Sequence, residues 1–379
     1  MRVALHCGTL RGFGSGLVGR NLLEHLAAQG PEHRFLAWVP SEWAADHGVT
    51  PARVASNVEL RYSRPGIAQK ITLENWHIRR ALKDWRADVL FSAGDTSLLF
   101  CPVPHLLLVH QANLVYGRTE KDYPVGFAMR LRWMAMAAYL RVGLGSVTAL
   151  TVQTAEMAKR VHDRFGYPRE RITVVPSSVG RAEGESSICD DLDEAPPFVT
   201  YVASASPHKN FEVLAPMMAL LRNRCPGLQC RLTIAPGRVP ALEEAIDRLQ
   251  VADRFVFEGP VSGKRAQQLI RRARVVVMPS KLESFGICYY ESLAAGTPVV
   301  ASDRPFAREA CGVAAFYANA NSGEEFADRV ADLVLDEEHR QAAAEASRGR
   351  FEEVSVGWSV IAAKYLEILE TLVAGERRG

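Results

Sequence analysis

Short apolar runs alternate with helical stretches along this chain, and the alternation stops once and then starts again. The strand-like runs of the first half are RVALHC (2–7), RFLAWVP (34–40), ADVLFSA (87–93), HLLLVH (105–110), ALTVQT (149–154) and ITVVPS (172–177). Helical stretches, such as those at 16–29 and 153–165, separate them. Buried parallel strands covered by helices on both faces produce this pattern. We therefore expect an α/β fold built on a doubly wound, Rossmann-like sheet.

The interruption is GRAEGESSICDDLDEAPP (180–197), an acidic stretch rich in Gly, Ser and Pro. It has no apolar periodicity, which is typical of an interdomain linker. Beyond it the pattern predicts strands at 197–203, 230–236, 254–260, 274–280 and 297–302 and helices at 210–223, 262–273 and 286–295. A chain of 379 residues is also long enough for two domains. We expect domains at 1–180 and 198–357 joined by a linker at 181–197, with a helix in 358–379 that packs back on the first domain.

Composition narrows the function classes. No run of 18 uncharged apolar residues is present, and the first apolar run is too short for a signal peptide, which favours a cytoplasmic location. The seven cysteines are odd in number and lack the spacing of a zinc site, so we expect reduced thiols and no bound metal. Residues 1–180 hold 22 Lys and Arg against 14 Asp and Glu. Such a basic half could face anionic lipid or a phosphorylated acceptor, or reflect ordinary surface variation.

The most informative segment is PSKLESFGICYYESLAAGTPVVAS (279–302). A buried strand ends near Pro279, Glu283 lies in the following loop, and a helix begins near Gly286. Free amides at a helix start favour an anion, and glycine allows the anion to approach closely. Glu291 lies five residues beyond Gly286, which is about 7.5 Å along a helix. A carboxylate accepts two hydrogen bonds, as a vicinal diol offers, although two such glutamates alone could be ordinary surface residues.

The whole segment resembles the Glu-x7-Glu signature, here Glu283 to Glu291, of retaining glycosyltransferases of the GT-B fold, family 4, also called group 1. The resemblance implies two Rossmann-like domains that face each other across a cleft. It implies that Glu283 contacts the hydroxyls of the donor sugar and that Glu291 holds the ribose diol. The amides of Phe285, Gly286 and Ile287 would then cradle the donor diphosphate. No separate cofactor is implied, because the nucleotide-diphosphate sugar is a substrate.

Other parts of the second half extend the resemblance. Lys209, in YVASASPHKNFEVL (201–214), matches the family lysine that neutralises the donor phosphates. The family often has an arginine where this chain has Ser204. Lys209 would then neutralise the donor phosphates with less help, which His208 or an arginine elsewhere could supply. Gly259 and Val261 would offer backbone contacts to the nucleotide base.

In the first half, Gly14, Gly16 and Gly19 formally match a dinucleotide-binding fingerprint. The glycines do not follow the strand directly, and no acid ends the next strand, so NAD is not expected. The resemblance instead makes Gly14, Ser15 and Gly16 an acceptor or diphosphate loop, the alternative being a plain helix cap. His110 ends a strand and matches the family histidine near the donor sugar. Asp95 is a weaker candidate for acceptor contact.

The stretch VGFAMRLRWMAMAAYLRVGLG (125–145) mixes apolar residues with Arg130, Arg132 and Arg141. We favour core packing with snorkelling arginines, and the alternative is a basic amphipathic helix on a membrane surface.

These features predict a metal-independent enzyme that moves a sugar from a nucleotide-diphosphate sugar to a hydroxyl of a saccharide or lipid-linked saccharide, in polysaccharide or glycolipid assembly. Peripheral membrane contact is an accompanying hypothesis, and nucleic acid is not an expected partner. Two rivals remain open: a non-catalytic sugar-nucleotide-binding or scaffold protein, and a sugar-nucleotide epimerase or phosphorylase of the same fold.

Overall fold

The computed structural model describes residues 1–8, 13–63, 73–117, 122–179 and 196–376. It divides into two compact units, and each has its own sheet. Unit 1 comprises Met1–Gly117, Gly126–Ser178 and Val356–Gly379, and unit 2 comprises Arg118–Val125 and Val179–Ser355. Six cysteines among the described residues are free thiols. No described helix is both long enough and apolar enough to cross a membrane.

Within the described residues, unit 1 holds a seven-stranded sheet in the order β3-β2-β1-β4-β5-β6-β7, in which every neighbouring pair is parallel. Its strands are β1 (Arg2–His6), β2 (Arg34–Pro40), β3 (Val58–Ser63), β4 (Val89–Ser92), β5 (His105–Val109), β6 (Ala149–Val152) and β7 (Ile172–Val174). Its α-helices are α1 (Phe13–Gln29), α2 (Ser41–Asp46), α4 (Arg79–Asp84), α5 (Ala112–Val115), α6 (Phe127–Gly143), α7 (Ala155–Phe165) and α15 (Trp358–Glu376). A π-helix (Leu73–Ile78) precedes α4, and short 3-10 turns lie at Leu144–Ser146 and Arg169–Arg171.

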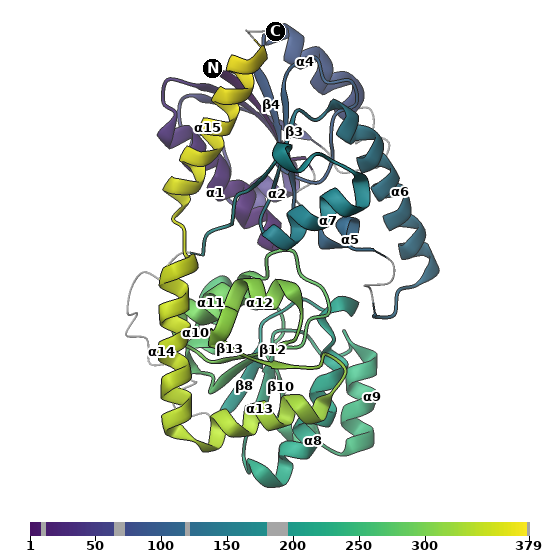
Figure 1. Cartoon of the computed structure of the whole chain (residues 1–379), viewed down its shortest axis with the longest axis vertical. Helices are drawn as coiled ribbons and strands as arrows, with labels where there is room; N and C mark the ends of the chain where they lie inside the picture. Colours follow the sequence, from purple (N-terminus) through teal and green to yellow (C-terminus); the bar gives the residue numbers. More distant parts are fainter. Residues whose placement is uncertain (9–12, 64–72, 118–121, 180–195, 377–379) are drawn as a thin grey trace. The chain divides into compact units, whose positions relative to one another are not determined.

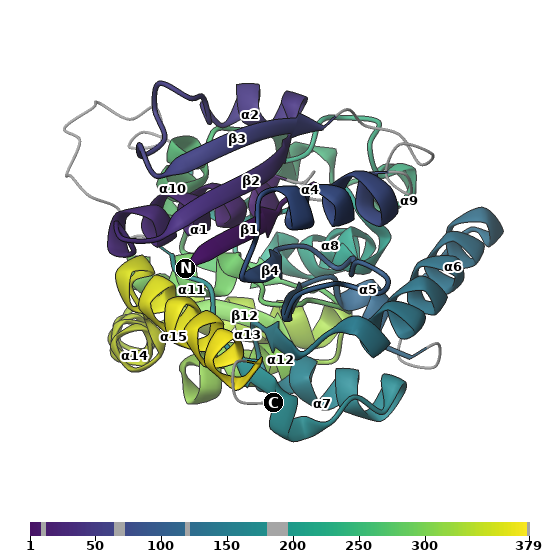
Figure 2. The same cartoon turned by 90° about the horizontal axis from the view of Figure 1, so that it is seen from above.

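Helices cover both faces of this sheet. Alternate residues of a strand point to opposite faces, so neighbouring residues of β1 belong to different core clusters. Val3 and Leu5 of β1 pack in a cluster with α1 and α15. Ala4 packs in a second cluster with Ile78 and with Leu82 of α4. Figures 1 and 2 both show α15, in yellow, beside α1, in purple, and residues of both helices share the first cluster. The C-terminal helix therefore completes the core of unit 1.

Unit 2 holds, among its described residues, a six-stranded parallel sheet in the order β10-β9-β8-β11-β12-β13. The strands are β8 (Phe198–Tyr201), β9 (Gln229–Leu232), β10 (Phe255–Phe257), β11 (Val275–Met278), β12 (Val299–Ser302) and β13 (Ala315–Ala318). The α-helices are α8 (Leu214–Arg224), α9 (Pro240–Leu249), α10 (Gly263–Arg272), α11 (Ile287–Ala295), α12 (Pro305–Cys311), α13 (Gly323–Leu335) and α14 (Glu337–Val354). Short 3-10 turns lie at Pro207–Lys209, Phe211–Val213, Ala252–Arg254 and Gly312–Ala314. Two parallel sheets with flanking helices confirm the predicted α/β fold class.

The prediction that 125–145 packs in the core is wrong for the N-terminal part of α6. Phe127 is 83% exposed, Leu131 56% and Met134 64%. Only Ala137, Leu140 and Gly143, near the C-terminal end of the helix, are buried along it. The packing surface is confined to that end, and Phe127, Leu131 and Met134 before it face solvent. Figure 1 shows α6 along one side of unit 1.

Candidate functional site

The strand order of unit 2 reverses between β8 and β11, and both strands are parallel. In open α/β sheets, ligands bind at the carboxyl ends of the strands on either side of such a reversal. Lys209 lies in the turn that follows β8, and Glu283 lies in the loop that follows β11. The topology therefore brings these two predicted site residues to the same edge of the sheet.

Glu283 is held through one of its two oxygens. Its Oε1 accepts hydrogen bonds from Nζ of Lys209, at 2.6 Å, and from Oγ of Ser280, at 2.7 Å. Oε2 takes part in none of the contacts that the structure describes. The arrangement holds Oε1 in place and leaves the second oxygen for another hydrogen-bond donor.

The charge of Glu283 is stabilised by its neighbours. Burial would raise the pKa of its carboxyl, but Lys209, His208 and the hydrogen bonds from Lys209 and Ser280 outweigh burial and lower the pKa. Ser280 has a single hydroxyl hydrogen, which it donates to Glu283, so Tyr201 must donate in the 2.6 Å contact between its hydroxyl and Oγ of Ser280. Glu283 is therefore ionised at neutral pH and sits at the end of a short buried hydrogen-bond chain.

The loops that carry Lys209 and Glu283 are also joined by hydrogen bonds to backbone groups. Asn210 adopts a left-handed conformation, with φ of 56°, directly after Lys209. Its Nδ2 donates to the carbonyl oxygens of Pro279 and Ala320, at 3.0 and 2.7 Å. The amide of Lys281 donates to the carbonyl of His208 at 2.8 Å. The spacing of lysine and glutamate is thus preorganised and does not depend on their ion pair alone.

His208 is uncharged at neutral pH, so it lowers the pKa of Glu283 only at acidic pH, where its imidazole is protonated. Burial, and then the neighbouring Lys209 ammonium, lowers the pKa of its imidazole to about 4. Its ring lies 6.0 Å from that of Tyr123, in a tilted arrangement. Ser204, which stands where an arginine was expected from the resemblance, is exposed and contacts Ser206 at 3.4 Å. Lys209 is consequently the cation that faces Glu283.

The start of α11 is built for a close approach. Gly286 precedes the helix with φ of +71°, and no side chain caps the first turn. A Cβ added at Gly286 would lie 2.5 Å from Cδ2 of Tyr289, so a side chain does not fit there. Phe285 stacks on Tyr290 with ring centroids 4.1 Å apart, which positions the chain entering the helix. The first amides of α11, beginning with Ile287, are therefore open to an anion.

Glu291 lies on the second turn of α11 and has a different environment from Glu283. It forms no hydrogen bond or ion pair among those that the structure describes, and burial raises the pKa of its carboxyl to about 7. A partly buried carboxylate without a partner is costly to keep, and perturbed groups of this kind gather at functional sites. This glutamate is the clearest unfilled hydrogen-bonding group of the region.

Gly259 and Val261 follow β10 at the same edge of the sheet. Gly259 has φ of +72°, and its amide donates to the carbonyl of Ile234 at 3.2 Å. The preceding Glu258 is held by Arg231 at 2.7 Å and by Arg265 at 3.1 Å. This pairing fixes the loop on which Gly259 and Val261 lie.

In unit 1, His110 and Asp95 lie together at the carboxyl ends of the neighbouring strands β5 and β4. Oδ1 of Asp95 accepts from the amides of His110 and Gln111, both at 2.9 Å, and Oδ2 lies 3.3 Å from Nε2 of His110. Nδ1 of His110 is buried and has no hydrogen-bond partner in the described structure. Asp95 therefore orients the histidine, a relationship that the sequence did not reveal.

Gly14, Ser15 and Gly16 form part of the first turn of α1. A Cβ added at Gly16 would lie 2.6 Å from Nε1 of Trp43 and from Nε2 of His47, so glycine allows a close contact with α2. The side chain of Ser15 lies outside the described residues.

Sequence reasoning missed Ser280, Tyr201 and Asn210 as parts of the site. Ser280 lies at the start of the segment 279–302, but its residue type alone does not show that it bonds to Glu283. Tyr201 is separated from Ser280 by 79 residues, so no local pattern could join them.

Two family models match the chain and together span most of it. "Glycosyltransferase Family 4" matches residues 14–181, and "Glycosyl transferases group 1" matches residues 190–350. D-inositol 3-phosphate glycosyltransferase of Nocardia farcinica is 34% identical over 167 residues, which cover 41% of this chain and 37% of that enzyme. The enzyme of the same name from Pseudarthrobacter chlorophenolicus is 27% identical over 79% of this chain and 78% of its own length.

Solved structures share the fold at low identity. Sucrose-phosphate synthase from Thermosynechococcus elongatus superposes with a TM-score of 0.73 over 99% of this chain and 100% of its own, at 16% identity. Anabaena HepE, crystallised with UDP and glucose, gives 0.73 over 98% and 100%, at 15% identity. WaaG, a glycosyltransferase of lipopolysaccharide biosynthesis, gives 0.70 over 97% and 99%, at 18% identity. Family models, relatives and fold thus agree that this chain belongs to the family 4, or group 1, glycosyltransferases of the GT-B fold.

Proposed function

We propose that this protein is a retaining, metal-independent glycosyltransferase that moves a sugar from a nucleotide-diphosphate sugar to an acceptor hydroxyl. The proposal rests on the groups that lie together at the carboxyl-end edge of the unit 2 sheet. There, the uncapped start of α11 lies between a fixed glutamate paired with Lys209 and an unpartnered glutamate one turn along the helix. That set of groups suits a diphosphate flanked by two hydroxyl-bearing sugars.

Each group has a role that follows from its chemistry. The amides of Phe285, Gly286 and Ile287 and the ammonium of Lys209 would stabilise the negative charge that develops on the leaving diphosphate. Oε2 of Glu283 would accept from a hydroxyl of the transferred sugar, since Oε1 is already engaged. Glu291 would accept from the ribose diol, and backbone groups at Gly259 and Val261 would contact the base.

Metal independence is supported by the partner of Glu283. A lysine ammonium already occupies the carboxylate oxygen at 2.6 Å, and a cation bound there would be repelled by it. Activity that is abolished by a chelator and restored by Mg²⁺ would contradict this part of the proposal.

For unit 1 we propose that His110, oriented by Asp95, contacts a sugar hydroxyl at the reaction centre, and that the turn at Gly14, Ser15 and Gly16 faces the acceptor or the diphosphate. The acceptor would be a saccharide or a lipid-linked saccharide in polysaccharide or glycolipid assembly. Support comes from the basic balance of residues 1–180 and from the name of one structural neighbour, which acts in lipopolysaccharide biosynthesis.

The test is nucleotide-dependent stabilisation. Unfolding of the wild type and of Glu291→Ala would be followed with UDP, GDP, ADP and CDP in the presence of EDTA. A ligand present at 100 times its dissociation constant adds about 2.7 kcal/mol to the free energy of unfolding. We expect one diphosphate to stabilise the wild type and not the variant, which also identifies the base. Stabilisation by none of the four would overturn the donor site.

Turnover then separates transfer from binding alone. The glycosyltransferase should consume its sugar nucleotide only when an acceptor is present. A scaffold protein would bind the donor without consuming it, and an epimerase would convert it without an acceptor.

We also propose that the protein works in the cytoplasm and that α6 rests on an anionic membrane surface. The helix carries Arg130, Arg132 and Arg141 and no acidic residue, and its large apolar side chains face solvent. Cationic heads beside exposed apolar side chains are the composition of an interfacial helix.

Vesicle co-sedimentation tests this contact. Binding should be stronger to vesicles that contain anionic lipid than to zwitterionic ones, and Leu131→Glu with Met134→Glu should abolish it. Val313→Glu is the matched control, since Val313 is fully exposed in unit 2. Equal binding by the control and the α6 variant would exclude α6 as the contact.

A further inference from the structure

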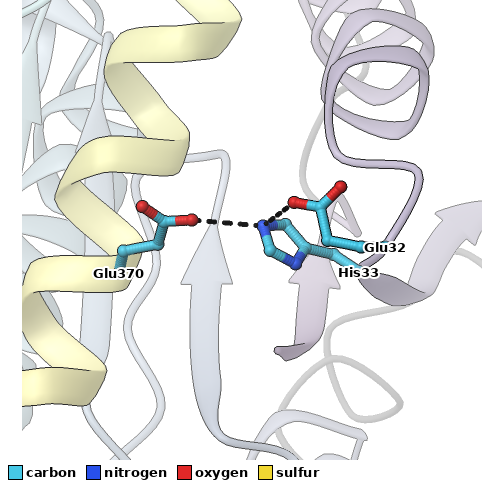
Figure 3. Close-up of side chains that lie close together, drawn as sticks. All are labelled: Glu32, His33 and Glu370. Atoms are coloured by element: carbon cyan, nitrogen blue, oxygen red, sulfur yellow. Dashed lines mark ion pairs between the residues drawn. The ribbon is translucent and has the colours of Figure 1, made fainter.

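Three side chains of unit 1 that have no role in the proposed function lie close together. Glu32 and His33 lie just before β2, and Glu370 lies on α15. Nε2 of His33 is 3.0 Å from Oε1 of Glu32 and 3.3 Å from Oε1 of Glu370 (Figure 3). One ligand atom from each side chain lies within 4.8 Å of the other two.

The imidazole at the centre of this group is buried, while the carboxylates are not. His33 is 6% exposed, and its Nε2 has no hydrogen-bond partner in the described structure. The carboxylates approach that nitrogen without the geometry of a hydrogen bond. A buried ring nitrogen that faces two carboxylates without a hydrogen bond can hold a metal cation there in place of a proton.

The loop that presents His33 is rigid. Nδ2 of Asn57 lies 3.1 to 3.2 Å from the carbonyl oxygens of Ala27, Gly30 and His33. A Cβ at Gly30 would lie 2.7 Å from Cδ2 of His33, so the ring packs tightly against that glycine. The ring's other nitrogen, Nδ1, lies 3.2 Å from the amino nitrogen of Met1. The imidazole is therefore fixed in position before any ligand binds.

On the opposite side, the stretch of α15 that carries Glu370 is fixed by packing. Its neighbours Leu369 and Val373 are 0% and 7% exposed and belong to the core cluster that α15 shares with α1. The glutamate itself, with a side chain that is 57% exposed, points from the edge of this packed helix toward His33 (Figure 3).

We propose that Glu32, His33 and Glu370 bind a divalent transition-metal ion of the Zn²⁺ type, which fastens α15 to the loop before β2. Ligand atoms around a tetrahedral zinc ion, with bonds of about 2.0 Å, lie about 3.3 Å apart. The distances of 3.0 and 3.3 Å from Nε2 match that edge. Imidazole suits Zn²⁺ and Ni²⁺, whereas Mg²⁺ favours oxygen ligands alone. Water would fill the remaining position.

Nδ1, the ring nitrogen that would not bind the metal, lies 3.2 Å from the amino nitrogen of Met1. A metal-bound histidine usually has such a partner on its second nitrogen. This site is structural. It lies at the edge where β2 begins, whereas Asp95 and His110 lie where the parallel strands β4 and β5 end.

The test uses exposed glutamates, because removing the buried His33 could unfold the protein. Thermal unfolding and equilibrium binding would be measured with Zn²⁺ and with Mg²⁺ for the wild type, Glu370→Gln, Glu32→Gln and Glu367→Gln. Glu367 is the matched control, since it lies one turn earlier on the same helix and is 65% exposed. We expect Zn²⁺, and not Mg²⁺, to raise the Tm of the wild type and of the control.

Loss of either ligand glutamate should weaken Zn²⁺ binding by about tenfold or more, since even outer-shell partners contribute that much. Two results would overturn the proposal: a wild type whose Tm does not respond to Zn²⁺, or a response equal in Glu370→Gln and Glu367→Gln. The zinc assay uses no sugar nucleotide, so its outcome is independent of the donor-site test. Chelator effects on activity should be measured in Glu370→Gln, where this site is already disabled.

Discussion

Lys209 and Glu283 form an ion pair of 2.6 Å in which the side chains are 17% and 8% exposed. Little water is present to compensate either charge if its partner is lost. Lys209→Met should therefore destabilise the protein by about 3–5 kcal/mol, the usual effect of leaving one buried charge unpaired. Combining it with Glu283→Gln should restore most of that loss, although transfer remains abolished. Urea unfolding of the single and double variants measures the coupling, and strictly additive losses would contradict it.

Glu291 predicts a stability change with a defined pH dependence. The pKa of its carboxyl is raised by burial from 4.5 to about 7, so ionising it is harder in the folded protein than in the unfolded chain. Its ionisation therefore costs stability, and this cost develops as the pH rises from 4.5 to 7 and stays constant above. Glu291→Gln should be more stable than the wild type at pH 8 and similar at pH 4.5. Thermal unfolding at the two pH values checks this.

Glu283 is a control for this prediction, because its ionisation changes the stability of the protein in the opposite direction. The pKa of its carboxyl is lowered in the folded state, so its charge adds stability that is present above the ordinary pKa and is lost as the pH falls. Glu283→Gln should accordingly be less stable than the wild type at pH 8. A gain of stability in both glutamine variants would show that burial dominates at both sites.

Gly286→Ala should abolish donor binding and lower stability. The substitution adds a Cβ 2.5 Å from the ring of Tyr289 and also places a side chain at φ of +71°. Gly227→Ala separates the two effects, since Gly227 has φ of +78° with nothing within 4 Å of its Cβ position. The control should lose only about 1–2 kcal/mol from backbone strain. Nucleotide titrations compare the two, and undiminished affinity in Gly286→Ala would remove the helix start from the site.

Asp95→Ala should reduce turnover more than Asp95→Asn. Alanine leaves the amides of His110 and Gln111 without their acceptor, at about 1–3 kcal/mol each, and releases the imidazole. Asparagine keeps an oxygen that can accept from those amides, although it loses the charge beside Nε2. Turnover and Tm should be measured for both variants. Equal turnover in the wild type and Asp95→Ala would show that the orientation of His110 is unimportant.

The interior strands were predictable from the sequence, as were the edge strands β7 and β10, but the other two edge strands were not. RFLAWVP predicted β2 at its observed bounds, because a strand buried on both faces is almost continuously apolar. β3, with the sequence VELRYS, and β13, with AFYA, were missed. Each lies at an edge of its sheet, where fewer apolar residues are needed.

The site could be predicted only where its signal was local. Glu283, Gly286 and Glu291 lie within nine residues of one another and could be read from one segment. The pairing of Asp95 with His110, and the chain from Tyr201 through Ser280, depend on loops brought together by strand order. The exposure of α6 was missed because a helix of apolar residues and arginines has the same composition whether it lies in a core or on a surface.

The interleaved course of the chain has a consequence for the order of synthesis. The core of unit 1 includes Ile361, Tyr365 and Leu369 of α15, whereas unit 2 is complete at Ser355. On the ribosome, the first sheet to be translated must wait for the last helix, while the second can finish earlier. Since exposed apolar surface on a nascent chain promotes aggregation, a nonsense mutation just before α15 would release a finished unit 2 attached to a unit 1 that cannot close.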